Sequence, residues 1–147
     1  MKSRSLQLMA LLGALILAST SASAEEQWPD LLGTWQGHTQ AVAVGNTTHH
    51  GNGSHDTPRM VDTRFIIHIN HQVGRRFSGN IESTHTAGQR VTFVGTFTND
   101  QHHATIVDSD GTQQFRLISD NEFELCYTHS TSDGHAAGCG TFSRLLN

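Results

Sequence analysis

Lysine is almost missing from this sequence of 147 residues, because Lys2 is the only one. Mechanisms that need a lysine Schiff base, a phosphate-loop lysine or a lysine general base therefore have no residue to use in the rest of the chain. The catalytic patterns HExxH and GxSxG and the phosphate loop are missing too. The formal net charge of −4 also argues against a polybasic surface. We therefore expect no nucleic-acid partner.

Residues 1–24 have the three parts of a secretory signal peptide. Lys2 and Arg4 come first, an apolar run follows over residues 6–18, and Ala22-Ser23-Ala24 gives the small-x-small pattern that precedes a cleavage site. The alternative is a membrane anchor, but the run is shorter than the roughly 18 residues that a spanning helix needs. We expect cleavage before Glu25, no membrane insertion afterwards, and a periplasmic or secreted protein.

Cysteine is also scarce, with only Cys126 and Cys139 in the chain. A periplasmic or extracellular compartment is oxidising, and cysteines there are more often paired than free. We predict a disulfide between the two, which leaves no thiol to act as a nucleophile.

Helical periodicity is absent after Ala24. In its place, short alternating segments rich in Phe, Ile, Val and Thr recur between Gly, Asn, Asp and Ser. These eight segments cover residues 34–44, 61–71, 76–85, 90–98, 103–109, 112–118, 122–129 and 136–145. Eight sequential antiparallel strands can close an up-and-down barrel. We predict that residues 25–147 form a single all-β domain of this kind.

Turn signals predict the strand registers. Residues 72–74 suit a three-residue loop with Gly74 left-handed, residues 110–111 suit a two-residue turn, and residues 119–121 suit a turn with a left-handed Asn121. The Cys126–Cys139 pair sets the last hairpin. These registers place opposite each other Ile69 and Phe77, Ile106 and Phe115, Leu117 and Phe123, and Phe123 and Phe142. Each one gathers apolar residues on one face, as a buried sheet face requires.

Small residues are frequent on the predicted inner face. After Trp35 the first strand offers only small inward residues, and Gly79, Gly95, Gly138 and Gly140 add more. An eight-stranded barrel is just wide enough to fill itself or to hold one small ligand. The small residues favour a ligand cavity; the alternative is that they relieve crowding beside the seven phenylalanines. The expected ligand-binding residues are Ala41, Ala43, Phe65, Ile81, Phe93, Asp108, Gln113, Tyr127 and His129.

The segment Leu32-Gly33-Thr34-Trp35-Gln36-Gly37 resembles the LxGxW-like opening of barrels in the calycin superfamily, which includes lipocalins, fatty-acid-binding proteins and avidins. It also looks like the opening of the haem-binding nitrobindins. In calycins the Trp packs at the closed end of the barrel against an Arg or Lys from the last strand. The resemblance implies that Trp35 and Arg144 have these structural roles. It also implies a ligand inside the barrel, without naming the ligand.

Eleven histidines are the main compositional oddity. His49, His50 and His55 lie in a long Gly-rich segment, residues 45–60, that would overhang the open end. Imidazoles with Asp56 beside them could hold Zn²⁺ or Cu²⁺, although the spacing matches no known ligand motif. A solvated loop is the alternative.

The combined observations favour a calycin-like barrel that binds a small, partly apolar molecule through its open end. The runner-up is a metal or haem binder that uses the histidine-rich segment. The third possibility is an enzyme in which Asp108, Tyr127 and His129 form an acid-base group, although polar anchors for a ligand explain these residues more simply. The sequence names no cofactor.

Overall fold

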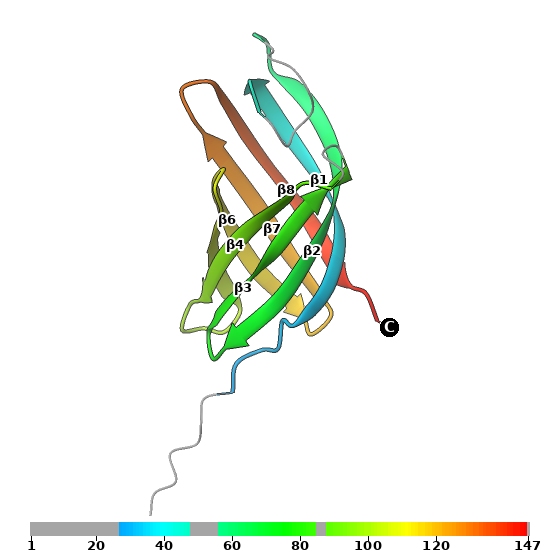
Figure 1. Cartoon of the computed structure of the whole chain (residues 1–147), viewed down its shortest axis with the longest axis vertical. Helices are drawn as coiled ribbons and strands as arrows, with labels where there is room; N and C mark the ends of the chain where they lie inside the picture. The colour runs from blue at the N-terminus through cyan, green and yellow to red at the C-terminus, as the bar shows by residue number, and fades with distance from the viewer. Residues whose placement is uncertain (1–26, 48–55, 85–87, 147) are drawn as a thin grey trace, which may run out of the picture.

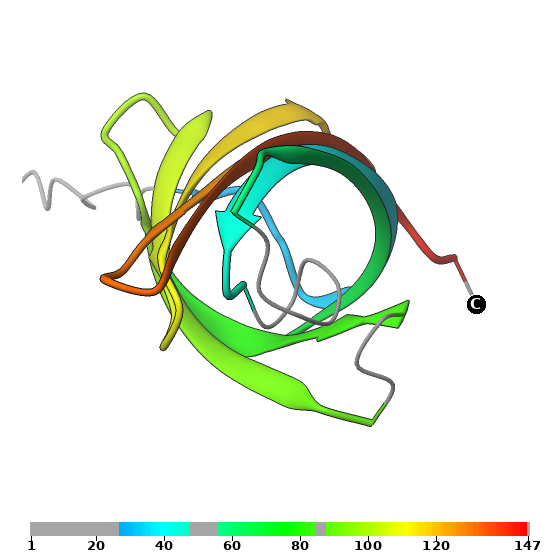
Figure 2. The same ribbon diagram turned by 90° about the horizontal axis from the view of Figure 1, so that it is seen from above.

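The computed structural model describes residues 27–47, 56–84 and 88–146, which form one closed eight-stranded antiparallel barrel and so confirm the predicted fold class. Each strand pairs with its neighbours in chain order, and the last pairs with the first (Figures 1 and 2). No helix in these ranges is long and apolar enough to cross a membrane. The strands are β1 (Gly33–Gly45), β2 (Arg59–Val73), β3 (Arg76–Ser83), β4 (Arg90–Phe97), β5 (His103–Val107), β6 (Thr112–Ser119), β7 (Glu122–Ser130) and β8 (Gly134–Arg144).

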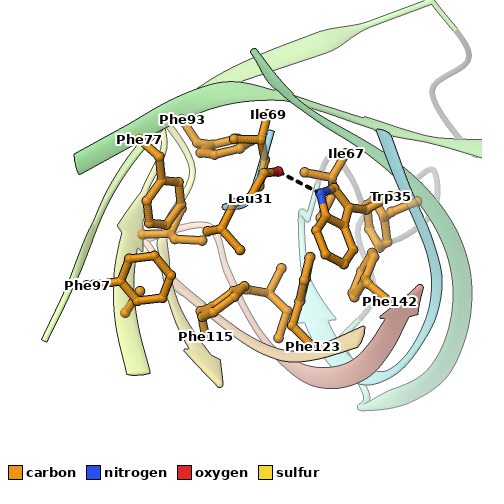
Figure 3. Close-up of a cluster of buried hydrophobic side chains, with 14 residues drawn as sticks. Leu31, Trp35, Ile67, Ile69, Phe77, Phe93, Phe97, Phe115, Phe123 and Phe142 are labelled. Atoms are coloured by element: carbon orange, nitrogen blue, oxygen red, sulfur yellow. Dashed lines mark hydrogen bonds between the residues drawn. The ribbon is translucent and has the colours of Figure 1, made fainter. Parts of the chain in front are cut away.

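Alternation along the strands separates a buried inner face from an exposed outer face. On β7, for example, Phe123 and Leu125 are buried, whereas the residues between and beside them are more exposed. The buried cluster fills one half of the barrel and is dominated by aromatic rings (Figure 3). Its members are Leu31, Trp35, Phe65, Ile67, Ile69, Phe77, Phe93, Phe97, Ala104, Ile106, Phe115, Phe123, Leu125 and Phe142.

Trp35 and Arg144 seal the closed end of the barrel. Trp35 is fully buried, and its indole Nε1–H donates a hydrogen bond to the Leu31 carbonyl at 3.0 Å (Figure 3). The Arg144 guanidinium carbon lies 4.2 Å from the centroid of the Trp35 ring, a cation–π geometry. Arg144 also donates hydrogen bonds to the carbonyl oxygens of Asp30, Leu32 and Asp120. The Arg144 guanidinium therefore links the last strand to the segment before β1 and to the turn between β6 and β7.

That preceding segment is itself part of the core, which the sequence did not reveal. Leu31 is fully buried, and its backbone N–H donates to the side-chain oxygen of Gln72 at 2.9 Å. The amide nitrogen of Gln72 donates in turn to the Pro29 carbonyl at 2.7 Å. Trp28 packs on Phe97 with the ring centroids 5.9 Å apart. Residues 28–31 thus form a plug beneath the barrel.

The predicted registers of the last two hairpins are confirmed. Leu117 lies opposite Phe123, and Phe123 lies opposite Phe142. Cys126 and Cys139 are also opposite and form the predicted disulfide. One detail is wrong: among the described non-glycine residues the positive φ belongs to Gln101, so Asn121 is not left-handed.

The predicted register between β2 and β3 is wrong by two residues. Ile69 lies opposite Gly79 rather than Phe77, because the register shifts at a bulge between Ile69 and His71 and the turn is shorter than expected. Val73 pairs with Arg76, so two residues form the turn; the first of them, Gly74, has the expected positive φ of 56°.

The predicted register between β5 and β6 is also wrong by two residues. Ile106 lies opposite Gln113, not Phe115, and Val107 closes the hairpin by pairing with Thr112. The reason is Asp108, whose Oδ1 accepts the backbone N–H groups of Asp110 and Gly111, both at 2.8 Å. This Asx-type turn takes Asp108 out of the strand.

Phenylalanine rings cover several of the inward glycines. A Cβ atom built on Gly95 would lie 2.6 Å from the ring of Phe77, which is its partner across the β3–β4 pair. The same cross-strand arrangement joins Gly79 to Phe93 and Gly37 to Phe142. For these positions the crowding alternative is correct, because a ring occupies the space that the glycine leaves.

The wall of the barrel is uneven in height. Strands β1 and β8 pair along the whole of Trp35–Gly45, whereas β4 and β5 pair only over Val94–Phe97. Residues 90–93 of β4 therefore have no strand partner on the β5 side. In Figure 1, β1, β2, β7 and β8 rise well above the tops of β4 and β6. The open end is consequently lowest beside β4 and the β5–β6 turn.

Candidate ligand-binding cavity

A cavity occupies the open half of the barrel, above the aromatic cluster. It encloses about 570 Å³ of empty space when its mouth is included, and about 40 Å³ of this is open to the centres of water molecules. A few waters or part of a small ligand therefore fit inside without rearrangement. The lining residues are Thr39, Phe65, Ile81, Ser83, Val91, Asp108, Asp110, Gln113, Leu125, Tyr127, Gly138 and Phe142.

The base of the cavity is apolar. Phe65, Leu125 and Phe142 belong to the buried cluster and also line the cavity. Ile81, which packs against the same cluster, and Val91 extend this surface towards the low side of the wall. An apolar group placed here would lose contact with water, at a gain of about 25 cal/mol for each Å² buried.

Asp108 is the best-defined polar group of the cavity. Its Oδ2 accepts a hydrogen bond from Nε2 of Gln113 at 2.6 Å, in addition to the two backbone N–H groups bound by Oδ1. Gln113 is itself buried. Three donors therefore orient this carboxylate.

Tyr127 and His129 follow each other on the inner face of β7. Burial raises the pKa of the Tyr127 phenol, and the negative charges of Asp108 and Asp110 raise it further. The ring of His129 lies 6.3 Å from that of Tyr127, and its Nδ1–H donates to the Asp110 carbonyl. This bond leaves the histidine's Nε2 near the Thr131 hydroxyl, at 3.5 Å. Because its pKa is raised, the Tyr127 phenol stays protonated and acts as a hydrogen-bond donor or acceptor.

Thr63 provides a further polar group close to the cavity. It lies opposite the lining residue Thr39, whose hydroxyl donates to the Thr63 carbonyl at 3.3 Å. The Thr63 side chain is almost fully buried, and its own hydroxyl oxygen has no hydrogen-bond partner among the described residues. A buried hydroxyl of this kind lowers the stability of the fold unless a ligand or a water molecule forms a hydrogen bond with it.

Five of the nine residues expected at the ligand site line the cavity, namely Phe65, Ile81, Asp108, Gln113 and Tyr127. Phe93 does not, because the β3–β4 register lays its ring over Gly79. Ala41 and Ala43 lie further along β1 towards its tall end, opposite Val61 and Arg59. His129 lies opposite Ala136, one inward step beyond Tyr127, and turns its ring towards the β5–β6 turn.

Several lining residues were not among the expected contacts. Thr39, Val91, Leu125 and Phe142 carry the inward signal of strand alternation and could have been found from it. Ser83 carries the same signal, because it continues the inward alternation of β3. Asp110 could not have been found, because its position depends on the turn that the Asp108 side chain organises. Gly138 also lines the cavity. Only a hydrogen atom fits at this position, because a Cβ atom would lie 2.5 Å from the Cβ atom of Ala41.

The proposed metal ligands His49, His50 and His55 lie outside the described residues, so the structure leaves that hypothesis open. Within residues 27–47, 56–84 and 88–146, no group of three or more His, Cys, Asp or Glu side chains is placed to hold a metal ion. His103 and Asp100 form an exposed pair at the opposite end, with 2.6 Å between Nδ1 and Oδ2.

Comparisons with known proteins find similar solved structures but no family. No protein-family model matches the sequence, and no curated protein matches it. Similar solved structures include EF1p2_mFAP2b bound to DFHBI, with 14% identity, a TM-score of 0.49, and coverage of 78% of this chain and 94% of that one. A redesigned β-barrel, mFAP0, bound to DFHBI has 17% identity and a TM-score of 0.48, with coverage of 78% and 98%. The redesigned β-barrel b11L5F_LGL has 16% identity and a TM-score of 0.47, with coverage of 79% and 92%.

Proposed function

We propose that this protein binds a small, partly apolar molecule in the open half of its barrel. The observation that carries the proposal is the contrast within one cavity: an apolar base formed by Phe65, Leu125 and Phe142 lies below the polar groups of Asp108 and Tyr127. Binding sites for small molecules typically combine an apolar wall with a few fixed polar groups. Catalysis is not needed to explain these groups, because the Asp108 carboxylate is already held by three donors and the Tyr127 phenol stays protonated.

A substitution that fills the cavity tests this function. Val91→Trp adds a large ring at a lining position, so that the variant should lose at least about 90% of the binding of indole, a small neutral aromatic probe, in isothermal titration calorimetry. Val94→Trp is the matched control, because Val94 points outward from the same strand and is 60% exposed. Native mass spectrometry of the purified protein should in addition reveal a bound small molecule. Equal probe binding by both variants, or no probe binding by the parent protein, would contradict the proposal.

We further propose that the barrel is of the calycin type. The support is the Trp35–Arg144 contact at the closed end, the arrangement that the opening segment of the chain resembles. The calycin arrangement has the ligand enter from the opposite end, where the cavity lies in this protein.

We also propose that residues 1–24 direct the chain to a periplasmic or extracellular space and are then removed. The disulfide between Cys126 and Cys139 supports an oxidising destination. Expression of the full chain in a secreting host, followed by N-terminal sequencing, should give a mature protein that begins at Glu25. An intact N-terminus in protein that has reached this compartment would contradict the proposal.

A further inference from the structure

The charged side chains among the described residues that line the cavity are acidic. Asp108 and Asp110 both line it, and the remaining described lining residues are neutral. Two basic residues occupy nearby positions of the inner face, Arg59 opposite Ala43 and His129 opposite Ala136, but neither lines the cavity. An anionic ligand would therefore lie against two carboxylates of the cavity wall.

The Asp108 carboxylate retains capacity for a ligand. An ionised carboxylate has about four acceptor positions, and three are occupied, two on Oδ1 and one on Oδ2. Its second oxygen can therefore accept one more donor. Asp110 follows it in the same turn, and the low wall beside β4 leaves this turn at the mouth of the cavity.

Tyr127 lies close to the same two carboxylates. Its phenol lines the cavity, and after burial the two causes that raise its pKa are the charges of Asp108 and Asp110. A field that opposes the formation of a phenolate at this point favours a cation at the same point. The protein as a whole, with a net charge of −4, also attracts cations from solution.

We propose that the ligand is a small organic cation, a protonated amine carried on an apolar body of about one ring. The ammonium group lies at the mouth, against Asp108 and Asp110, and the apolar body lies on Phe65, Leu125 and Phe142. The small enclosed space beneath the mouth limits the body to this size. This inference rests on the proposed function and adds the chemical class of the ligand.

Three compounds with the same phenyl ring test the inference: phenethylamine, 2-phenylethanol and 3-phenylpropionate, which are cationic, neutral and anionic at pH 7. Isothermal titration calorimetry at low ionic strength should give an affinity for the amine at least about tenfold higher than for the alcohol, with the acid weakest. Equal affinities, or the reverse order, would overturn the inference while leaving the cavity as a binding site.

Variants then assign the selectivity to the two carboxylates. Asp108→Asn keeps an oxygen for the turn but removes the charge, so the affinity for phenethylamine should fall about tenfold while that for 2-phenylethanol changes by less than about twofold. Asp110→Asn should have the same effect and provides a second readout if Asp108→Asn folds poorly. Asp120→Asn, in an exposed turn at the closed end, changes the net charge equally and should leave both affinities unchanged.

The outcomes separate the inference from the function on which it rests. If the Asp120 variant loses amine binding as strongly as the Asp108 variant, the effect is one of net charge and the inference is wrong. If none of the three compounds binds, the inference is also wrong, and the indole measurement decides whether the proposed function stands.

Discussion

Trp35 shows how much one side chain contributes to the closed end of the barrel. Its ring has no exposed surface, contacts the Phe123 ring with centroids 4.7 Å apart and lies beneath the Arg144 guanidinium. Its N–H group is paired with the Leu31 carbonyl, so burial leaves no polar atom unsatisfied. Removing this ring would open a cavity among side chains that cannot readily collapse.

Trp35→Ala should therefore lower the free energy of unfolding by about 3 to 5 kcal/mol, the usual cost of deleting a large buried aromatic residue. Trp28→Ala is the control and should cost less, because Trp28 is only half-buried and lies before the first strand. Urea unfolding followed by circular dichroism measures both. Equal losses would mean that the plug, rather than Trp35, organises the closed end.

Tyr127 is the only tyrosine of the chain, so its titration can be followed directly. Because burial and two carboxylates raise its pKa, the phenolate absorbance should appear at a higher pH than the usual value of about 10. The folded state then binds this proton more tightly than the unfolded state. Stability from this source is complete below about pH 10 and is lost as the pH rises towards the folded pKa.

The measurement is an ultraviolet titration of the native protein, with circular dichroism to confirm that the barrel remains folded. Asp108→Asn should move the midpoint down, because it removes one of the charges that raise the pKa. A midpoint at about 10 in the parent protein, or no change in the variant, would contradict this prediction.

At the scale of the element, the pairing of strands explains why glycine occurs at several inward positions. Gly95 and Phe77 face each other across β3 and β4, and the ring fills the space that a side chain on the glycine would need. A ring that covers a cross-strand glycine shields its backbone and packs the sheet more densely.

Gly95→Ala should cost about 1 to 3 kcal/mol, the range for overpacking a dense core. The added Cβ would lie 2.6 Å from the Phe77 ring and 3.1 Å from the Ile106 side chain, so both must move. Val94→Ala, on the exposed face of the same strand, should change stability by less than about 1 kcal/mol. A neutral Gly95→Ala variant would show that the rings have room to shift.

The disulfide joins β7 to β8 over a sequence separation of 13 residues. In the chain-entropy model, closing a loop of this size stabilises the folded state by about 3 kcal/mol. The double variant with Cys126→Ser and Cys139→Ser should lose about this amount in urea unfolding. Reduction with dithiothreitol should destabilise the parent protein equally and leave the variant unaffected. Two free thiols in protein isolated from its secretory compartment would contradict the pairing.

Sequence reasoning predicted which residues face inward better than it predicted their partners. Side chains alternate with a period of two, so the two-residue errors at β2–β3 and β5–β6 left every residue on its correct face. The bulge after Ile69 leaves no mark in the hydrophobic pattern. The turn at Asp108 forms because its side chain competes with strand pairing for backbone N–H groups. The dipeptide Asp110-Gly111 instead indicated a different turn, which would begin two residues further along the chain.

At the scale of the whole molecule, the low wall beside β4 divides the barrel into a strongly and a weakly paired side. In the described part of the chain, the backbone N–H and C=O groups of residues 90–93 that point away from β3 face no neighbouring strand. Amide hydrogen exchange should therefore be fastest, among the strand residues, at this part of β4 and slowest along β1, β7 and β8. Exchange measured by mass spectrometry on peptides of each strand tests this pattern. Uniform protection around the barrel would contradict it.

The cavity could be predicted only in outline, because it depends on the barrel as a whole. Strand alternation and the run of small residues on β1 indicated a cavity in the open half, and Phe65, Ile81 and Tyr127 line it. Its low mouth arises from the shortness of β5 and from the Asp108 turn, which no local pattern revealed. Asp108 was expected at the site from the sequence, whereas Asp110 was found there only in the folded structure.

The Arg144–Leu32 hydrogen bond connects residues that are 112 positions apart in the sequence. The pairing of β1 with β8 thus joins the first and last strands of the barrel, and it can form only after all the strands between them have been synthesised. Closing so long a loop costs conformational entropy before the contacts stabilise the fold, and this lowers the folding rate. Once formed, the same seam holds the first strand against the last, so that we expect local opening of the barrel to begin at the shorter β4–β5 pair instead.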